Sequence, residues 1–124
     1  FIKPADVTVL AAVKNAPFNI LHVHGTSVYL DLFFDYPRAA LNWPAHHSDW
    51  PVAKVRKATD RCLIAGIDER GPFAQGKMRA TIAEMTDALS EAGREKFMFG
   101  SECTIPPETP EEFIRATRDL AAQV

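Results

Sequence analysis

The chain has 124 residues, of which 47% are apolar and 24% are charged, the balance of an ordinary globular domain. Its 14 Lys and Arg residues and 16 Asp and Glu residues give a net charge of -2 without a basic stripe, so we expect no nucleic-acid partner. No apolar run approaches the ~18 residues of a membrane span, no signal-peptide pattern is present, and two cysteines are too few for a disulfide framework. These features predict one domain over residues 1–124 in the reducing cytoplasm, with no membrane partner.

Predicted helices and strands alternate along the chain. A helix over residues 3–15 is followed by a strand over 18–23, a short helix over 27–34 and a second strand over 39–43. A helix that begins near Ser48 or Pro51 precedes the third strand, residues 62–67, and a helix over 75–92 precedes the fourth, residues 97–100. A last helix begins near Thr109. The strands are short, nearly all apolar and bounded by Pro, Gly or charge, which is typical of strands buried on both faces.

The last two predicted helices carry the clearest signals. The buried face of the helix over residues 75–92 is predicted from four apolar residues at helical spacing, Met78, Ile82, Met85 and Leu89. Gly93 is typical of the residue that ends such a helix. For the last helix, Thr109 is predicted to cap the N-terminus, with Pro110 at the first helical position and Glu112 closing a capping box.

The alternation of strands and helices predicts an α/β fold with a parallel sheet and right-handed crossovers. Four such strands fit either a small doubly wound sheet or one half of an eight-stranded barrel, which needs ~250 residues in all. Both architectures place functional residues at the carboxyl ends of the strands. Ionisable side chains follow all four predicted strands here, whereas the strands themselves contain no Asp, Glu, Lys or Arg.

Two histidines end the first predicted strand, in the sequence His22-Val23-His24-Gly25. Because alternate residues of a strand point to the same face, both imidazoles project together. Cys103 follows the fourth predicted strand, at the same edge of the sheet. Two imidazoles and one thiolate with an open fourth position are a pattern of catalytic zinc sites, so one interpretation is a metal site of His22, His24 and Cys103. The other interpretation is a pair of hydrogen-bonded histidines at the rim of a barrel.

The remaining polar residues near the strand ends also allow two interpretations. Asp68 and Glu69 are either carboxylates that contact a substrate or a metal shell, or ordinary loop and helix-cap residues. We expect His46 and His47 to form a solvated loop pair. Cys62 opens a predicted strand at the opposite end of the sheet, so we expect it in the core.

Four phrases of the sequence resemble the C-terminal half of the uroporphyrinogen decarboxylase superfamily: ILHVHG, ALNW, CLIAGIDE and FGSECTIPPETPEEFIRATRD. They keep the order and spacing of the family's motifs and extend over nearly the whole chain. The resemblance implies a (β/α)8 TIM barrel, of which this chain would form the last four strands. Residues 1–124 would then be the second half of a longer protein.

The superfamily contains two chemical branches. Its decarboxylases remove acetate carboxyl groups from uroporphyrinogen in porphyrin biosynthesis without a metal, and they use a histidine in a Gly-His-Gly segment before a proline pair. The corresponding segment here runs from Gly100 to Pro107 and contains no histidine. Decarboxylation of uroporphyrinogen is therefore the alternative function.

The other branch consists of zinc-dependent, corrinoid-linked methyltransferases. Their signature is His-x-Cys-Gly after one strand and a Cys before the late proline pair, which His22, His24 and Cys103 match with His24 in place of the first Cys. The resemblance thus implies zinc-dependent methyl transfer from a corrinoid, carried by a partner protein, to a thiol. The small-molecule partner is expected to be that thiol or a methylated substrate. Substrate contacts are expected from three polar residues at the other strand ends and beside the ligands, Asn42, Asp68 and Glu102.

A half-barrel has consequences for activity and assembly. The fragment alone is expected to be inactive as an enzyme, and a non-catalytic role in metal binding or assembly is a further alternative. Two unpaired sheet edges and an exposed apolar face also predict that the chain forms a homodimer, or another homo-oligomer that pairs the same edges and covers the same face.

Overall fold

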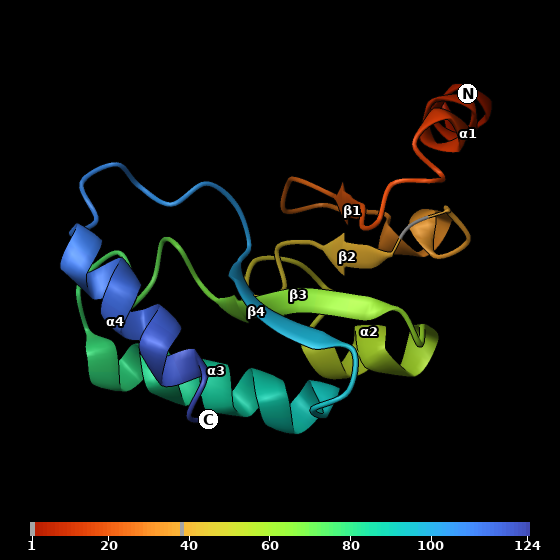
Figure 1. Cartoon of the computed structure of the whole chain (residues 1–124). Helices are drawn as coiled ribbons and strands as arrows, with labels where there is room; N and C mark the ends of the chain where they lie inside the picture. The colour runs from red at the N-terminus through yellow and green to blue at the C-terminus, as the bar shows by residue number, and fades with distance from the viewer. Residues whose placement is uncertain (1, 38) are drawn as a thin grey trace.

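The structure is a computed structural model that describes residues 2–37 and 39–124 (Figure 1). In this part of the chain the helices are α1 (Lys3–Ala12), α2 (Val52–Ala58), α3 (Met78–Ala92) and α4 (Glu111–Ala121), with a 3-10 helix, η1, at Leu30–Phe33. The strands are β1 (Ile20–His22), β2 (Ala40–Asn42), β3 (Cys62–Ile67) and β4 (Phe97–Ser101), so all four predicted strands are present. Within the same residues no helix is both long enough and apolar enough to cross a membrane.

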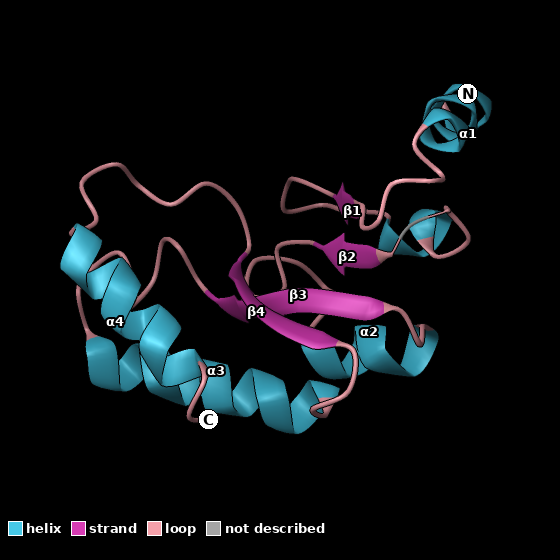
Figure 2. Ribbon diagram, in the orientation of Figure 1, coloured by secondary structure: helices cyan, strands magenta, loops and turns pink. Residues whose placement is uncertain are grey.

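One parallel sheet contains the strands in the order β1-β2-β3-β4, which confirms the predicted α/β class. The strand order does not reverse, and Figure 2 shows α2, α3 and α4 on one side of the sheet. A doubly wound sheet reverses its order and carries helices on both faces. The described residues therefore do not form the doubly wound sheet that the sequence also allowed.

The face of the sheet that α2 and α3 cover is the main hydrophobic core. Leu41 and Leu63 are partners in register and are fully buried there, in one cluster with Ala88 and Ala92 of α3. The helix approaches β3 closely, because a Cβ added to Gly66 would lie only 3.0 Å from that of Ala88. Glycine and alanine at this crossing thus set the distance between α3 and the sheet.

The opposite face of the sheet is open at its two edges. One row in register runs across the four strands on this face and consists of His22, Asn42, Ile64 and Met98. Because side chains alternate along a strand, this row faces away from the main core. Ile20 on β1 and Met98 on β4 are 53% and 46% exposed. The site described below is built on this uncovered side.

Several helix boundaries differ from the prediction. Residues 27–34 form only the 3-10 turn of η1, because Val28 and Tyr29 are poor helix formers and so short a segment gains little from helical hydrogen bonds. α1 ends at Ala12 instead of residue 15. α3 begins at Met78 instead of residue 75, because Gly76 has a φ of 66°, outside the right-handed helical region.

The buried face of α3 is rotated relative to the prediction. Its buried residues are Thr81, Met85, Ala88 and Ala92. Of the predicted face only Met85 belongs to this set, because small side chains are needed where α3 lies close to β3. The end of α3 immediately before Gly93 agrees with the prediction.

The predicted capping box of α4 is wrong. Pro110, not Thr109, is the N-cap residue, and no side chain caps the helix. The Thr109 hydroxyl is buried and has no hydrogen-bond partner among the residues that the structure describes. Its backbone N–H donates to the carbonyl of Pro106, within the turn that precedes the helix.

Candidate metal centre

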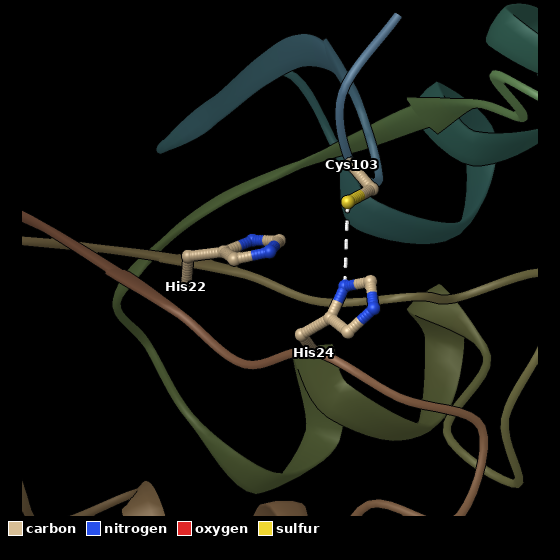
Figure 3. A group of neighbouring side chains, drawn as sticks. All are labelled: His22, His24 and Cys103. Carbon is tan, nitrogen blue, oxygen red and sulfur yellow. Dashed lines mark hydrogen bonds between the residues drawn. The ribbon is translucent and has the colours of Figure 1, made fainter.

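The three predicted metal ligands meet at the carboxyl edge of the sheet. His22 is the last residue of β1, His24 lies in the loop after it, and Cys103 follows β4. One candidate ligand atom from each residue lies within 4.8 Å of the other two, and Cys103 Sγ is 3.3 Å from His24 Nδ1 (Figure 3). Both histidines are exposed and Cys103 is partly buried. The grouping expected from the sequence is therefore found in the structure.

The orientation of His22 is fixed by Asn42, which is buried at the end of β2. The amide nitrogen of Asn42 donates to the carbonyl oxygens of Ile64 and Ser101, at 2.9 and 3.1 Å. Its other amide atom, Oδ1, therefore accepts the hydrogen bond from His22 Nδ1, at 2.6 Å. This bond places the ring proton on Nδ1 and leaves Nε2 of His22 with the lone pair that a metal ligand needs.

The loop that carries Cys103 is anchored by its neighbour Glu102. The Glu102 side chain is fully buried, and its Oε1 accepts hydrogen bonds from the His46 backbone N–H, at 2.7 Å, and from His46 Nδ1. The bond to Glu102 raises the pKa of His46 above its ordinary value, although burial acts in the opposite direction. The Ser101 hydroxyl donates to the Cys103 carbonyl at 2.7 Å. These contacts tie the loop after β4 to the loop after β2 and so determine where Cys103 lies.

A second histidine–carboxylate pair lies at the same edge. Asp68 Oδ1 accepts hydrogen bonds from His47 Nε2 and from the Arg70 backbone N–H, both at 2.9 Å. Burial alone would raise the pKa of Asp68, but these two bonds outweigh it and hold the pKa below its ordinary value. The expected solvated loop pair at His46 and His47 is found in part: both residues lie in a loop and are exposed, but each side chain also bonds a carboxylate and keeps only 32% or 35% of its surface exposed.

The predicted substrate contacts, Asn42, Asp68 and Glu102, all lie at this edge, and each makes hydrogen bonds within the protein. Asn42 uses both of its donors and its acceptor in this way, so its contribution here is to orient His22. Glu102 retains one buried oxygen, Oε2, without a partner among the described residues. A direct contact of these three residues with a substrate stays a prediction.

A pocket of about 230 Å³ opens beside the metal-ligand cluster. The residues that line it are His24, Gly25, Thr26, Pro44, His47, Glu69, Arg70 and Cys103. Glu69, which is only 3% exposed, lines this pocket, and its neighbour Asp68 does not. Nothing in the sequence distinguishes the two adjacent carboxylates in this respect. A larger cavity of about 570 Å³, lined by residues 56–60 and 92–96, lies before the amino ends of β3 and β4 and includes none of the cluster.

The donor set suits zinc. Imidazole nitrogen and thiolate sulfur are its usual protein ligands, and catalytic sites provide three of them and leave the fourth position open. Three ligands are what this cluster offers within the described residues. The hydrogen bond from His22 to Asn42 resembles the outer contacts that orient ligand histidines in metalloproteins.

Comparisons of this chain with protein-family models, with curated proteins and with solved structures found no match.

Proposed function

We propose that this chain carries the zinc site of a methyltransferase that moves a methyl group from a corrinoid to a small thiol. The proposal places it in the methyltransferase branch of the uroporphyrinogen decarboxylase superfamily. The observation that carries it is the convergence of His22, His24 and Cys103 within 4.8 Å at the carboxyl edge of a parallel sheet. His24 and Cys103 are 79 residues apart in sequence, so the fold and not the local chain brings them together.

Zinc in such a site keeps an open position and lowers the pKa of a thiol that binds there. His22, His24 and Cys103 serve as ligands and take no part as acids or bases. Asn42 keeps Nε2 of His22 available by holding the ring proton on Nδ1. In the overall reaction a sulfur–methyl bond forms, the cobalt–methyl bond breaks and leaves its electron pair on the corrinoid, and the thiol proton passes to solvent.

A corrinoid on a partner protein needs access to the thiol. The exposure of His22 and His24 supports such access, because the ligand cluster lies on the side of the sheet opposite α2 and α3. The small pocket beside the cluster suits the thiol, since about 230 Å³ is below the range of ~300–1,000 Å³ that is usual for drug-sized ligands.

We propose further that the sheet is half of a (β/α)8 barrel. β1 and β4 are the opposite edges of the sheet, and three strand spacings of ~4.8 Å would separate them by ~14 Å if it were flat. Their side chains and loops nevertheless bring ligand atoms within 4.8 Å of one another. This convergence favours a sheet curved toward the site, with the helices on the convex side as in a barrel.

Under this proposal a second copy of the chain completes the structure. β1 and β4 each leave one edge unpaired within the described residues, Ile20 and Met98 are exposed beside them, and α1 has no buried residue and lies apart from the sheet in Figure 1. Exposed edges and large apolar side chains favour association. Light scattering at micromolar concentration should find a homodimer, and a cooperatively melting monomer of 13.8 kDa would contradict the half-barrel.

Zinc analysis of the purified chain tests the metal site. We expect about one zinc per chain, as in a three-ligand catalytic site, and a large loss in Cys103→Ser. Cys62→Ser is the matched control, because Cys62 is the other cysteine of the sequence and begins β3, at the opposite end of the sheet from the cluster. Equal zinc in all three proteins would remove Cys103 from the site, and no zinc in any of them would refute the proposal.

A further inference from the structure

Glu69 is a buried carboxylate that the hydrogen bonds of the fold do not satisfy. It lies two residues beyond β3, and its side chain is only 4% exposed. Its Oε1 is 3.5 Å from Nε of Arg70, whose own side chain is 62% exposed. Its Oε2 is buried and has no hydrogen-bond partner among the described residues. A buried carboxylate oxygen without a donor is costly, and native proteins rarely leave one so unless a ligand or an ordered water supplies the donor.

The surroundings of Glu69 indicate what that ligand is. Glu69 lines the same pocket of about 230 Å³ as His24 and Cys103, two of the proposed metal ligands. A molecule whose sulfur is bound at the metal would therefore have its other end in a space that contains this carboxylate. The pocket is below the size range that is usual for drug-sized ligands, so it suits a small molecule.

We propose that Glu69 binds the ammonium group of the thiol substrate, so that the substrate class is small aminothiols. This assignment rests on the proposed function, because the thiol end needs the metal. An ammonium group supplies the N–H donor that Oε2 lacks, whereas the anionic end of a thiol supplies none and would meet the Glu69 carboxylate. Arg70, which also lines the pocket, contacts Oε1, so Oε2 is the oxygen that a substrate would engage once the Glu69 side chain turns toward the pocket that it lines.

Thiol binding to the cobalt-substituted chain tests the assignment, because a sulfur bound to Co²⁺ gives a charge-transfer band that can be titrated. The probes are cysteamine and 2-mercaptoethanol, which are equally long and differ in the end that would meet Glu69. The ammonium group also makes the thiol of cysteamine more acidic, which alters its binding to the metal without any contact with Glu69. This effect is the same in every variant, so the ratio of the two dissociation constants is compared between variants. We expect Glu69→Gln to reduce the preference for cysteamine about 10-fold or more, the usual effect of a hydrogen bond to a charged group, and to leave 2-mercaptoethanol binding unchanged. Glu95→Gln, at an exposed glutamate before β4, should behave as the original chain.

The outcomes separate the two proposals. Failure of the original chain to bind cobalt, or of 2-mercaptoethanol to produce the band, overturns the proposed function and this inference with it. Normal 2-mercaptoethanol binding with a cysteamine preference that persists in Glu69→Gln overturns the role of Glu69 alone. If Glu69→Gln does not fold, the original chain is titrated with cysteamine and with 2-mercaptoethanesulfonate. Tighter binding of 2-mercaptoethanesulfonate overturns the assignment to aminothiols, and tighter binding of cysteamine supports it.

Discussion

Replacing Asn42 by alanine is the change that best tests how the site is built. The substitution removes the acceptor of His22 Nδ1 and the two donors to the Ile64 and Ser101 carbonyls. Without Oδ1 the imidazole of His22 loses both its orientation and the contact that keeps the proton on Nδ1. Loss of such an outer contact to a ligand histidine typically costs 10–100-fold in metal affinity, or about 1.4–2.7 kcal/mol. We expect Asn42→Ala to bind zinc weaker by a factor in this range.

The same substitution also affects stability, and two further variants separate the effects. Each lost hydrogen bond costs about 1 kcal/mol, so Asn42→Ala should unfold more easily even without metal. Asn42→Asp keeps an acceptor for His22 but loses both donors, so we expect it to recover most of the zinc affinity and little of the stability. Asn19→Ala is the control at the opposite end of the strands, where Asn19 Oδ1 accepts a hydrogen bond from the Ala39 N–H at 2.6 Å. It should lower stability without changing zinc affinity.

Competition with a chromophoric chelator measures zinc affinity, and circular dichroism on the same samples measures folding. If folded Asn42→Ala binds zinc within threefold of the original chain, Asn42 does not orient a ligand and the assignment of His22 to the site loses its support. Equal loss of affinity in Asn42→Ala and Asn42→Asp would mean that the donors to the strand carbonyls, and not the acceptor for His22, sustain the site.

Three other predictions follow from the structure and the proposed function. The pKa of His46 is raised in the folded state by its bond to Glu102, with Glu84 and Asp68 nearby. The stabilisation from this bond is therefore complete below the ordinary pKa of 6.5, and it is lost as the pH rises through the raised pKa. The difference in Tm between the original chain and His46→Gln should therefore be larger at pH 6 than at pH 9, and an equal difference at both would argue against the ion pair. A longer protein that contains this chain should not convert uroporphyrinogen to coproporphyrinogen, since the segment from Gly100 to Pro107 lacks a histidine, and product formation at an enzymatic rate would instead favour the decarboxylase branch. Zinc should slow backbone hydrogen exchange in β1, because the metal would link His22 to the loop after β4. The three residues of β1 pair only with β2 in the described sheet, so this added link should be measurable. Unchanged exchange at saturating zinc would place the metal elsewhere.

The strands and the ligand cluster could be predicted from the sequence for simple physical reasons. A short apolar run between residues that break secondary structure has few alternatives to a buried strand, and β3 begins and ends where predicted. Parallel strands place their carboxyl ends at one edge, so residues that follow them in sequence become neighbours in space. That rule alone was enough to pair His22 and His24 with Cys103.

The contacts around the cluster could not be predicted in this way. His46 lies 56 residues from Glu102, and His47 lies 21 residues from Asp68, so neither pair leaves a pattern of local spacing. Which of Asp68 and Glu69 faces the pocket depends on the path of one loop, which no periodicity encodes. The rotation of the buried face of α3 has a similar cause. The helix passes close to Gly66, where an added Cβ would lie 3.0 Å from that of Ala88, and a helical pattern alone does not reveal which residue of the neighbouring strand it meets.

Asn42 connects the architecture of the sheet with the chemistry of the site. It lies on β2, its nitrogen donates to Ile64 of β3 and Ser101 of β4, and its oxygen accepts from His22 of β1, so one side chain links its own strand to the other three. β4 is two strands away from β2, which is ~9.6 Å in a flat sheet. A direct bond of 3.1 Å to the β4 carbonyl therefore favours strands that bend toward this side, independently of where the metal ligands lie. A sheet curved in this way would also bring the loop with Cys103 toward His24, whose Nδ1 is 3.3 Å from Cys103 Sγ.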